Sequence, residues 1–203
     1  MPRDTRTITP DDIMPLDAFE TIRAEKRQDN LIRKRFRRIA IGPFATIMFE
    51  NWDSMWWQVH EMLRVEKGGE EQVADELAAY NPMVPCGSEL TATLFFEVDD
   101  PVKRAAFLGK LGGVEGHIFI QIGDHRINAV SEGDTPRTNA DGKASAVHFL
   151  HFPFTPEQIA AFSYGLSHSQ ASAAMVGIDH AAYGHIALLG DELRSELARD
   201  FAP

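Results

Sequence analysis

The sequence predicts an α+β protein that folds as a single domain around a mixed, mainly antiparallel sheet, with flanking helices and a helical N-terminal extension. Its 203 residues, 44% of them hydrophobic and 25% charged, suffice for one well-packed core. Runs of β-branched and aromatic residues alternate irregularly with segments that carry helix-capping signals. Connections long enough for a parallel crossover occur only in places, so most strand pairs should be antiparallel.

The first 42 residues are predicted to be helical. Thr9-Pro10-Asp11-Asp12 combines an N-cap, a proline at the first helical position and acid in the first turn, so we expect a helix through about Glu20. A basic helix, separate from the first or continuous with it, should follow over 21–39 and end at Gly42-Pro43. We therefore divide the chain into an N-terminal extension, 1–42, and an α+β core, 43–203, within one folded unit.

The middle of the chain is predicted to contain two strands and three helices. Asp53 or Ser54 is the expected N-cap of the first helix, and Gly68-Gly69 ends it. Both strands are rich in β-branched and aromatic residues. The expected elements are a strand over 44–50, helices over 53–67 and 70–80, a strand over 90–98 and a helix over 101–111.

The C-terminal part is predicted to add a hairpin, two further strands and two helices. Gly123-Asp124 marks the hairpin turn, and Thr155 followed by Gln158 is a capping signature. The segment 131–143 is polar and is expected to be a mobile loop. The expected strands are 117–122, 126–130, 144–152 and 173–179, the last of the sheet, and the expected helices are 155–166 and 191–201.

Composition excludes several classes of protein. No apolar run approaches the roughly 20 residues that span a bilayer, and the first residues lack the apolar region of a secretory signal. A single cysteine, Cys86, rules out an internal disulfide framework and suits a reducing compartment, so we expect a cytoplasmic protein. The net charge of −10 argues against nucleic-acid binding, which needs a basic surface.

Positive charge is concentrated in the predicted basic helix. Between Arg23 and Arg38 lie eight basic and two acidic residues, a net charge of +6, so the rest of the chain carries −16. The simpler interpretation is a helix that lies against the acidic body of its own fold. The alternative is a docking site for an acidic partner or an anionic ligand. The docking candidates are Arg33, Lys34, Arg35, Arg37 and Arg38.

Short catalytic motifs are missing from the sequence. The glycine-rich stretch 109–116 fits neither a P-loop nor a dinucleotide fingerprint, so there is no nucleotide motif. The Gly-x-Ser-x-Gly elbow, His-Glu-x-x-His and Glu-x-x-His are absent too. His148 and His151 would point to opposite faces of a strand. Iron or another divalent metal stays possible only with ligands from several separate elements.

The helix after Phe49 is the most unusual segment. It holds all three tryptophans, Trp52, Trp56 and Trp57, interspersed with charged and amide side chains. Apolar bulk covers most of its circumference, which predicts a helix buried on two sides. Glu61 and Arg64 then form either a mutual pair or partners for a ligand, because an unpaired buried carboxylate costs several kcal/mol.

Two predicted strands end with a carboxylate, at Glu50 and Glu97. Parallel neighbours would bring both to one end of the sheet and build a paired-carboxylate site, whereas antiparallel strands would place them at opposite ends. His180 lies at a predicted strand end, three residues before Tyr183. The candidate ligand-pocket residues are Glu50, Asn51, Gln58, Glu61, Arg64, Tyr80, His180 and Tyr183. The candidate metal ligands among them are Glu50, Glu61 and His180.

Three groups of residues resemble an uncharacterised bacterial family that is described only as a domain of unknown function. They are Phe-Glu-Asn at 49–51, Gln-x-x-Glu-Met-x-Arg-x-Glu at 58–66 and Tyr-Asn-x-x-x-Pro at 80–85. The late Asp179-His180 segment also resembles the family, although Ala181 stands where the family pattern has proline. Genes of that family often stand beside rubrerythrin-like and iron–sulfur oxidoreductase genes, which implies a link to redox or peroxide metabolism.

Three functional hypotheses follow. The first is an accessory or ligand-binding component of a redox system, which docks a protein partner through the basic helix. The second is a metal-dependent or carboxylate-based enzyme that acts on a small polar ligand. The third is a structural or assembly protein, possible as an oligomer, whose polar helix residues pair only with each other. No membrane or nucleic-acid partner is expected.

Overall fold

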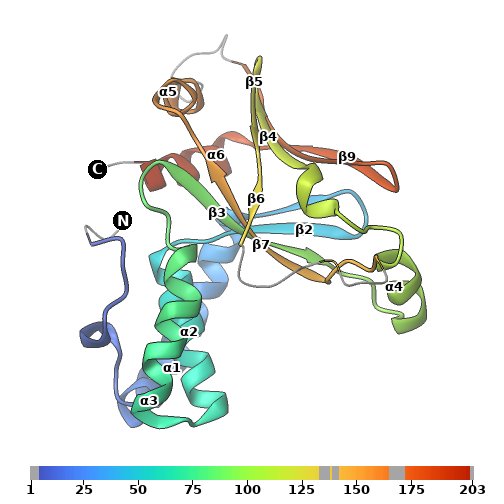
Figure 1. Ribbon diagram of the computed structural model, residues 1–203. Helices are drawn as coiled ribbons and strands as arrows, with labels where there is room; N and C mark the ends of the chain where they lie inside the picture. The colour runs from blue at the N-terminus through green and yellow to red at the C-terminus, as the bar shows by residue number, and fades with distance from the viewer. Residues whose placement is uncertain (1–4, 133–137, 139–141, 165–171, 202–203) are drawn as a thin grey trace.

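The computed structural model describes residues 5–132, 138, 142–164 and 172–201. Two antiparallel sheets form its upper half and three long helices its lower half (Figure 1). We call the first sheet A; its strand order is β1-β2-β3-β7-β6. These strands are β1 (Arg38–Ile41), β2 (Ala45–Phe49), β3 (Glu89–Phe96), β6 (Val130–Ser131) and β7 (Val147–Pro153). The sequence thus predicted the α+β class correctly.

The second sheet, sheet B, has the order β5-β4-β8-β9. Its strands are β4 (Ile118–Ile122), β5 (His125–Asn128), β8 (Ala174–His180) and β9 (Tyr183–Leu188). One face of sheet A packs on sheet B, and Ile47, Leu94, Ile120 and Val176 lie in the fully buried core between them. The single mixed sheet that we expected is therefore two sheets, and every strand pair in the described residues is antiparallel.

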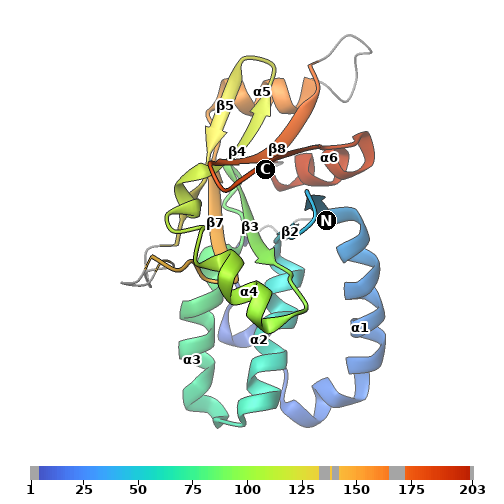
Figure 2. The ribbon, with the colours of Figure 1, turned by 90° about the vertical axis from the view of Figure 1, so that its right-hand side faces the viewer.

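A layer of three helices packs against one end of the other face of sheet A (Figures 1 and 2). They are α1 (Leu16–Arg37), α2 (Trp52–Glu66) and α3 (Gly69–Tyr80). Helix α2 packs against both α1 and α3, which confirms the expected burial on two sides. Together with the segment around Ile8, these helices enclose a second, smaller core that includes Trp52, Met55 and Val59.

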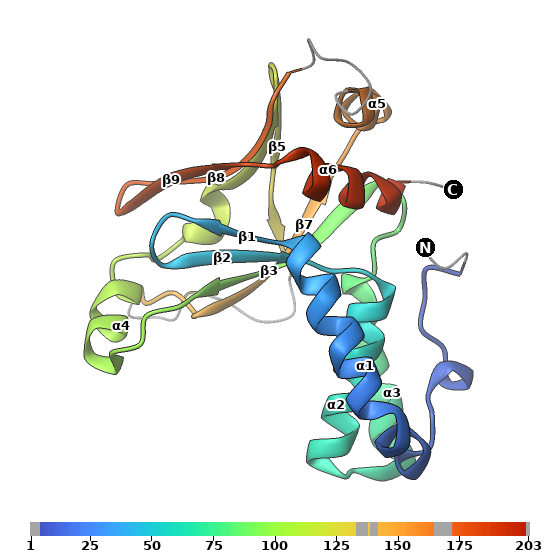
Figure 3. The ribbon, with the colours of Figure 1, turned by 180° about the vertical axis from the view of Figure 1, so that it is seen from behind.

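Three shorter helices complete the fold. They are α4 (Pro101–Leu108), α5 (Pro156–Tyr164) and α6 (Asp191–Ala198). Helix α6 contacts both α5 and α1 and so links the C-terminus to the N-terminal helix (Figure 3). Because β1 pairs with β2, the last residues of the expected extension 1–42 share sheet A with the rest of the chain.

Local signals explain where α2 begins and ends. Asn51 is its N-cap, because the side-chain oxygen of Asn51 accepts the amide of Ser54 at 2.9 Å. Ser54 returns the contact, since its Oγ accepts the amide of Asn51 at 2.9 Å. Our expectation of Asp53 or Ser54 as N-cap was therefore wrong by two or three residues. The helix ends where Lys67 adopts a left-handed conformation with φ 56°.

The structure corrects the predicted N-terminal helix. Thr9 does cap a helical turn, but it is a 3₁₀ turn over Pro10–Asp12. Pro15 then precedes α1, which runs without a break to Arg37. The basic helix ends two residues earlier than expected, because Arg38 to Ile41 pair with β2.

The C-terminal elements agree with the sequence except at two strands. The expected strand over 126–130 is divided between β5, which pairs with β4 in sheet B, and β6, which pairs with β7 in sheet A. After β8 the chain turns and returns as β9, which the sequence analysis did not predict. The polar loop expected over 131–143 lies largely outside the described residues. In the described part of the chain, no helix combines the length and apolar character that crossing a membrane requires.

Candidate functional site

A cavity of about 430 Å³ lies between the helix-facing side of sheet A and the layer of α1, α2 and α3. Polar, aromatic and charged side chains from all of these elements meet in it, which is the usual composition of a small-molecule site. Its lining consists of Asn30, Lys34, Arg38, Met48, Glu50, Ser54, Met55, Trp57, Gln58, Tyr80, Thr93, Phe95, Glu97, Val147 and Phe149.

Glu50 is the most deeply placed charged group of the cavity. Its residue is only 6% exposed. One carboxyl oxygen accepts the hydroxyl of Ser54 and the other accepts the hydroxyl of Thr93, each at 2.6 Å. Burial raises the pKa of the Glu50 carboxyl, against the opposing effect of these two hydroxyls and of the nearby cations. A buried carboxyl with a raised pKa inside a cavity is a common feature of functional sites.

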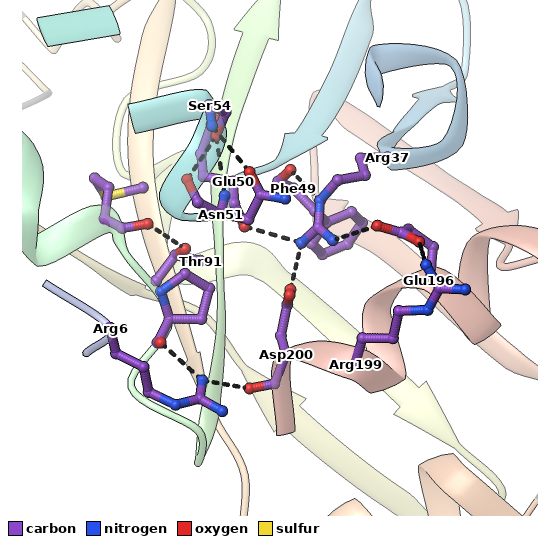
Figure 4. Close-up of polar contacts among 12 residues, drawn as sticks. Arg6, Arg37, Phe49, Glu50, Asn51, Ser54, Thr91, Glu196, Arg199 and Asp200 are labelled. Atoms are coloured by element: carbon purple, nitrogen blue, oxygen red, sulfur yellow. Dashed lines mark hydrogen bonds and ion pairs between the residues drawn. The ribbon is translucent and has the colours of Figure 1, made fainter. Parts of the chain in front are cut away.

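The position of Glu50 follows from the turn between β2 and α2. Strand β2 ends at Phe49 and Asn51 caps α2, so Glu50 is the only residue between strand and N-cap. The guanidinium of Arg37, which is 1% exposed, donates to the carbonyl oxygens of Phe49 at 3.0 Å and Glu50 at 2.9 Å (Figure 4). Arg37 therefore fixes both carbonyl groups of this turn.

Arg37 is itself anchored by acids of the C-terminal region. It pairs with Asp200 and, at 3.3 Å, with Glu196 (Figure 4). Arg6 adds a further link, because it donates to the main-chain carbonyl of Asp200 at 2.7 Å and to that of Pro85 at 3.1 Å. The turn that carries Glu50 is thus anchored by a network of ionic and hydrogen-bonding contacts between residues near both ends of the chain.

Three further polar side chains face the cavity from the helices. Gln58 on α2 donates to the hydroxyl of Tyr80 on α3 at 3.4 Å. Burial raises the pKa of Tyr80. Asn30 on α1 is 5% exposed, and its side-chain oxygen accepts from Arg33 at 3.3 Å. Within the described residues, the Asn30 amide nitrogen and the Gln58 amide oxygen have no partner, so both are available to a ligand.

The outer part of the cavity carries paired and unpaired charges. Arg38 makes a two-point contact with Glu97 at 2.8 Å, and Thr46 donates to the same carboxylate at 2.6 Å. The Thr46 hydroxyl and Arg38 lower the pKa of Glu97. Lys34 is exposed and makes no ion pair in the part of the chain that the structure describes, but its charge lowers the pKa of Glu50 from a distance.

The structure brings together three of the predicted ligand-pocket residues. Glu50, Gln58 and Tyr80 line the same cavity. Asn51 lies next to Glu50 but serves as the helix cap.

Glu61 and Arg64 instead join α2 to α1. Glu61 forms a two-point contact with Arg23 at 2.7 and 2.9 Å, and this contact lowers the pKa of the Glu61 carboxyl. Arg64 pairs with Glu20 at 2.6 Å. Neither residue lines the cavity.

The two candidates from sheet B, Tyr183 and His180, make hydrogen bonds to the main chain away from the cavity. Tyr183 is buried; its hydroxyl donates to the carbonyl of Ile41 at 2.6 Å and accepts the amides of Phe44 and Ala45 at 3.0 Å. His180 lies at the β8–β9 turn, where its ring accepts the amide of Ala182 at 3.2 Å. Neither belongs to the cavity lining.

The candidate metal ligands Glu50, Glu61 and His180 occupy three separate surroundings. In the described residues, no group of three or more His, Cys, Asp or Glu side chains is arranged to hold an ion. Glu50 and Glu97 follow antiparallel strands and so leave sheet A at opposite ends. The paired-carboxylate site, which required parallel strands, is therefore not formed, although both side chains reach the cavity.

The basic helix mostly pairs with its own fold. Five of the eight basic residues from Arg23 to Arg38 contact acids: Arg23, Lys26, Arg33, Arg37 and, at the start of β1, Arg38. Among the docking candidates, Arg37 is buried, whereas Lys34 and Arg35 are exposed and without an acidic partner in the described residues.

Several residues of the cavity were not predicted from the sequence. Thr93 and Phe95 alternate with buried Ala92 and Leu94 along β3, so the two-residue period of a strand would have assigned them to the second face. Asn30 gave no signal of its own within a run of charged residues.

A larger cavity, of about 660 Å³, lies between the N-terminal segment and the outer ends of the helices. Its walls are mainly apolar and include Met14, Phe19 and Leu63. His60 is its buried polar group, and both ring nitrogens are engaged, with the amide of Met14 at 3.0 Å and the carbonyl of Trp56 at 2.8 Å. This cavity therefore offers a ligand fewer polar groups than the one at Glu50.

Comparisons with known proteins agree with the resemblance seen in the sequence. A crystal structure of a novel protein of unknown function from Burkholderia pseudomallei K96243 is 32% identical, with a TM-score of 0.86 over 96% of this chain and 98% of that chain. No curated protein matches. The family profile described as "Protein of unknown function (DUF3501)" matches residues 7–201. The chain therefore belongs to the DUF3501 family.

Proposed function

We propose that this protein binds a small polar ligand in the cavity between sheet A and the helical layer. The observation that carries this proposal is Glu50, a buried carboxyl that lines a cavity and whose oxygens have only two hydroxyls as hydrogen-bond partners among the described residues. Asn30 and Gln58 add amide atoms for which the described residues supply no partner. The volume of about 430 Å³ suits a small molecule, since such sites typically measure roughly 300–1,000 Å³.

A thermal-shift screen of small amines, carboxylates, phosphates, sugars and heterocycles tests this proposal. A ligand that binds only the folded state raises the melting temperature. The stabilisation should disappear in Gln58→Trp, which fills the cavity from α2. The matched control is Val65→Trp, which introduces the same side chain on the same helix at a position that is 66% exposed. Hits that persist in Gln58→Trp, or a screen without hits, would oppose the proposal.

A carboxylate-based enzyme is the second candidate, and the raised pKa of Glu50 favours it. A carboxyl whose pKa is raised by burial holds its proton more readily than an ordinary glutamate, which suits general acid or base catalysis. Mass spectrometry of a bound compound after incubation separates the two functions. Conversion by the wild-type protein but not by Glu50→Gln indicates catalysis, whereas an unchanged compound indicates binding alone.

The ligand-binding protein would serve as an accessory component of redox or peroxide metabolism in the cytoplasm. The gene associations implied by the family resemblance support the metabolic link, and the single cysteine suits the compartment. A protein partner would contact the exposed basic residues Lys34 and Arg35 on α1.

Titration with a rubrerythrin-like protein from the same organism tests this link. An electrostatic contact should weaken between about 0.05 and 0.5 M salt and in the charge-reversed Arg35→Glu variant. The matched control is Glu25→Gln on the same helix. The absence of binding, or binding that is indifferent to salt, counts against the docking surface.

A further inference from the structure

We propose that the ligand of this cavity is an organic cation, whose primary or methylated ammonium group lies against the Glu50 carboxylate among aromatic side chains. This inference rests on the proposed function, because it names the chemical class of a ligand for the same cavity. It is carried by the partners of Glu50, by the aromatic lining and by the positions of the competing charges.

The partners of Glu50 leave its charge without a direct counter-ion. An ionised carboxylate has about four acceptor positions, of which the hydroxyls of Ser54 and Thr93 occupy two. Arg37 is near, but its guanidinium donates to the carbonyl of Glu50 and pairs with Asp200. Among the described residues, no cationic side chain bonds to the carboxyl oxygens. A ligand cation would complete the set and offset the cost of burying the charge.

The lining around Glu50 is rich in groups that attract cations. Trp57, Tyr80, Phe95 and Phe149 contribute aromatic rings from α2, α3, β3 and β7. The face of an aromatic ring attracts an ammonium ion by about 0.5–2 kcal/mol, and cages of such rings recognise methylated amines. Aromatic rings that line the same cavity as a buried carboxylate therefore favour an organic ammonium over a hydrated metal ion or an anion.

Two positive side chains also line the cavity, and their positions limit their influence. The charge of Arg38 is balanced by Glu97 at 2.8 Å. Lys34 is exposed, so water and salt weaken the effect of its charge, although Arg37 and Lys34 both lower the pKa of Glu50 from a distance. The charge of Glu50 acts in a buried region, where the effective dielectric constant is lower and electrostatic interactions are stronger. The deep end of the cavity is accordingly selective for positive charge.

Three probes that share a phenyl group test this selectivity by isothermal titration calorimetry. They are 2-phenylethylamine, which is a cation, 2-phenylethanol, which is neutral, and 3-phenylpropionate, which is an anion. We expect the amine to bind about tenfold more tightly than the alcohol, and the anion to bind least. The wild-type protein serves for this comparison, so that no variant has to fold.

Two variants identify the carboxylate that is responsible. Glu50→Gln keeps the size of the side chain and removes its charge, so it should lose the preference for the amine and keep the affinity for the alcohol. The matched control is Glu61→Gln, which removes a carboxylate of α2 that pairs with Arg23 outside the cavity, and which should change amine binding less than about twofold. Circular dichroism confirms that both variants fold.

The pH dependence gives a second measurement that needs no variant. Burial raises the pKa of Glu50, so protons compete with the ligand cation for the same carboxylate. The affinity for 2-phenylethylamine should fall as the pH is lowered from about 8 to about 5, whereas the affinity for 2-phenylethanol should stay constant.

The outcomes separate this inference from the proposed function. If the alcohol or the anion binds and the amine is not preferred, the ligand is not a cation, but the proposal of a ligand-binding cavity stands. Equal losses in Glu50→Gln and Glu61→Gln also overturn the inference of a cation, because the preference would then reflect net charge alone. If none of the three probes binds, and the thermal-shift screen also finds no compound sensitive to Gln58→Trp, both proposals fail together.

Discussion

Arg37 and Glu50 are joined through the main chain, since Nη2 of Arg37 donates to the carbonyl oxygen of Glu50 at 2.9 Å. The carboxyl group of Glu50 instead accepts the hydroxyls of Ser54 and Thr93. One buried cation thus fixes the turn between β2 and α2 without a direct bond to the carboxyl group. The cavity consequently retains an acidic group for which the ligand can supply the counter-charge.

Replacing Glu50 with Gln should stabilise the protein at neutral pH more than in acid. Burial raises the pKa of this carboxyl in the folded state. The favourable contribution of Glu50 to the free energy of unfolding is therefore complete below the unfolded pKa of about 4.3. It is lost as the pH rises through the pKa of the folded state. We expect a gain in the free energy of unfolding on the order of 1 kcal/mol near pH 7, measured by urea denaturation at about pH 4 and pH 7. An equal loss of stability at both pH values would contradict this.

Replacing Arg37 with Met should destabilise the fold by about 3–5 kcal/mol, because it leaves Asp200 buried without its partner. Two main-chain carbonyls, of Phe49 and Glu50, would also lose their donor. Urea denaturation measures the change. Arg35→Met on the same helix is the control; this side chain is exposed and should alter stability by no more than about 0.5 kcal/mol. Equal effects of the two substitutions would show that the buried network contributes little.

The sequence predicted those elements whose ends carry strong local signals. Gly68-Gly69 separates α2 from α3, and Asp100-Pro101 starts α4, as expected. Strand β9 was missed, because no run of β-branched or aromatic residues marks its six positions. The change from helix to strand at Arg38 was missed too, because it depends on pairing with Met48, a tertiary contact that local propensity does not encode.

The site was predictable only in part. Glu50 and Gln58 were found because they lie within one unusual segment around α2, and Tyr80 because it opens the Tyr-Asn-x-x-x-Pro motif of the family. Asn30 reaches the cavity from a helix that lies distant in sequence, so no local pattern reveals it. Arg64 was misassigned because its partner, Glu20, also lies on that helix.

Acid should loosen the N-terminal segment through His60. The Nε2 atom accepts the amide of Met14 at 3.0 Å, so the ring proton lies on Nδ1, which donates to Trp56. Burial lowers the pKa of His60 in the folded state. The contribution of the neutral His60 ring to the free energy of unfolding is complete above the unfolded pKa of about 6.5. It is lost as the pH falls through the lowered pKa of the folded state.

Amide hydrogen exchange of Met14 measures this effect, after correction for the intrinsic pH dependence of exchange. Protection should fall between about pH 7 and pH 5. In His60→Leu the amide should be poorly protected at both pH values, because its acceptor is gone. Constant protection in the wild-type protein would exclude His60 as the group responsible.

His151 should have the opposite pH dependence. Its ring lies between Glu89 at 3.0 Å and Glu132 at 2.7 Å, and the hydrogen bond to Glu89 is the main reason that its pKa is raised to about 9. The stabilisation is complete below the unfolded value of about 6.5 and is lost as the pH rises through about 9. His151→Gln should cost on the order of 2 kcal/mol near pH 6 and much less near pH 10. Urea denaturation of both proteins at the two pH values gives the difference. A cost that does not vary with pH would contradict a stabilising role of the charged His151 ring.

Replacing Tyr183 with Phe should destabilise the protein because its hydroxyl connects the two sheets. The hydroxyl donates to the carbonyl of Ile41 on β1 and accepts the amides of Phe44 and Ala45, all from a position on β9. Its loss leaves a buried carbonyl without this donor, at a cost of about 1–3 kcal/mol.

Tyr80→Phe is the matched control for this prediction. It removes the same hydroxyl from a cavity wall, where the one hydrogen bond that it accepts in the described residues measures 3.4 Å. Its effect on the free energy of unfolding should stay below about 0.5 kcal/mol. It should, however, lower the affinity of the cavity for its ligand. Equal destabilisation by the two substitutions would mean that the hydroxyl of Tyr183 does not hold sheet B to the β1–β2 hairpin. If Tyr183→Phe alone is destabilised and still binds the ligand normally, Tyr183 is a structural residue and the site is confined to the helix-facing side of sheet A.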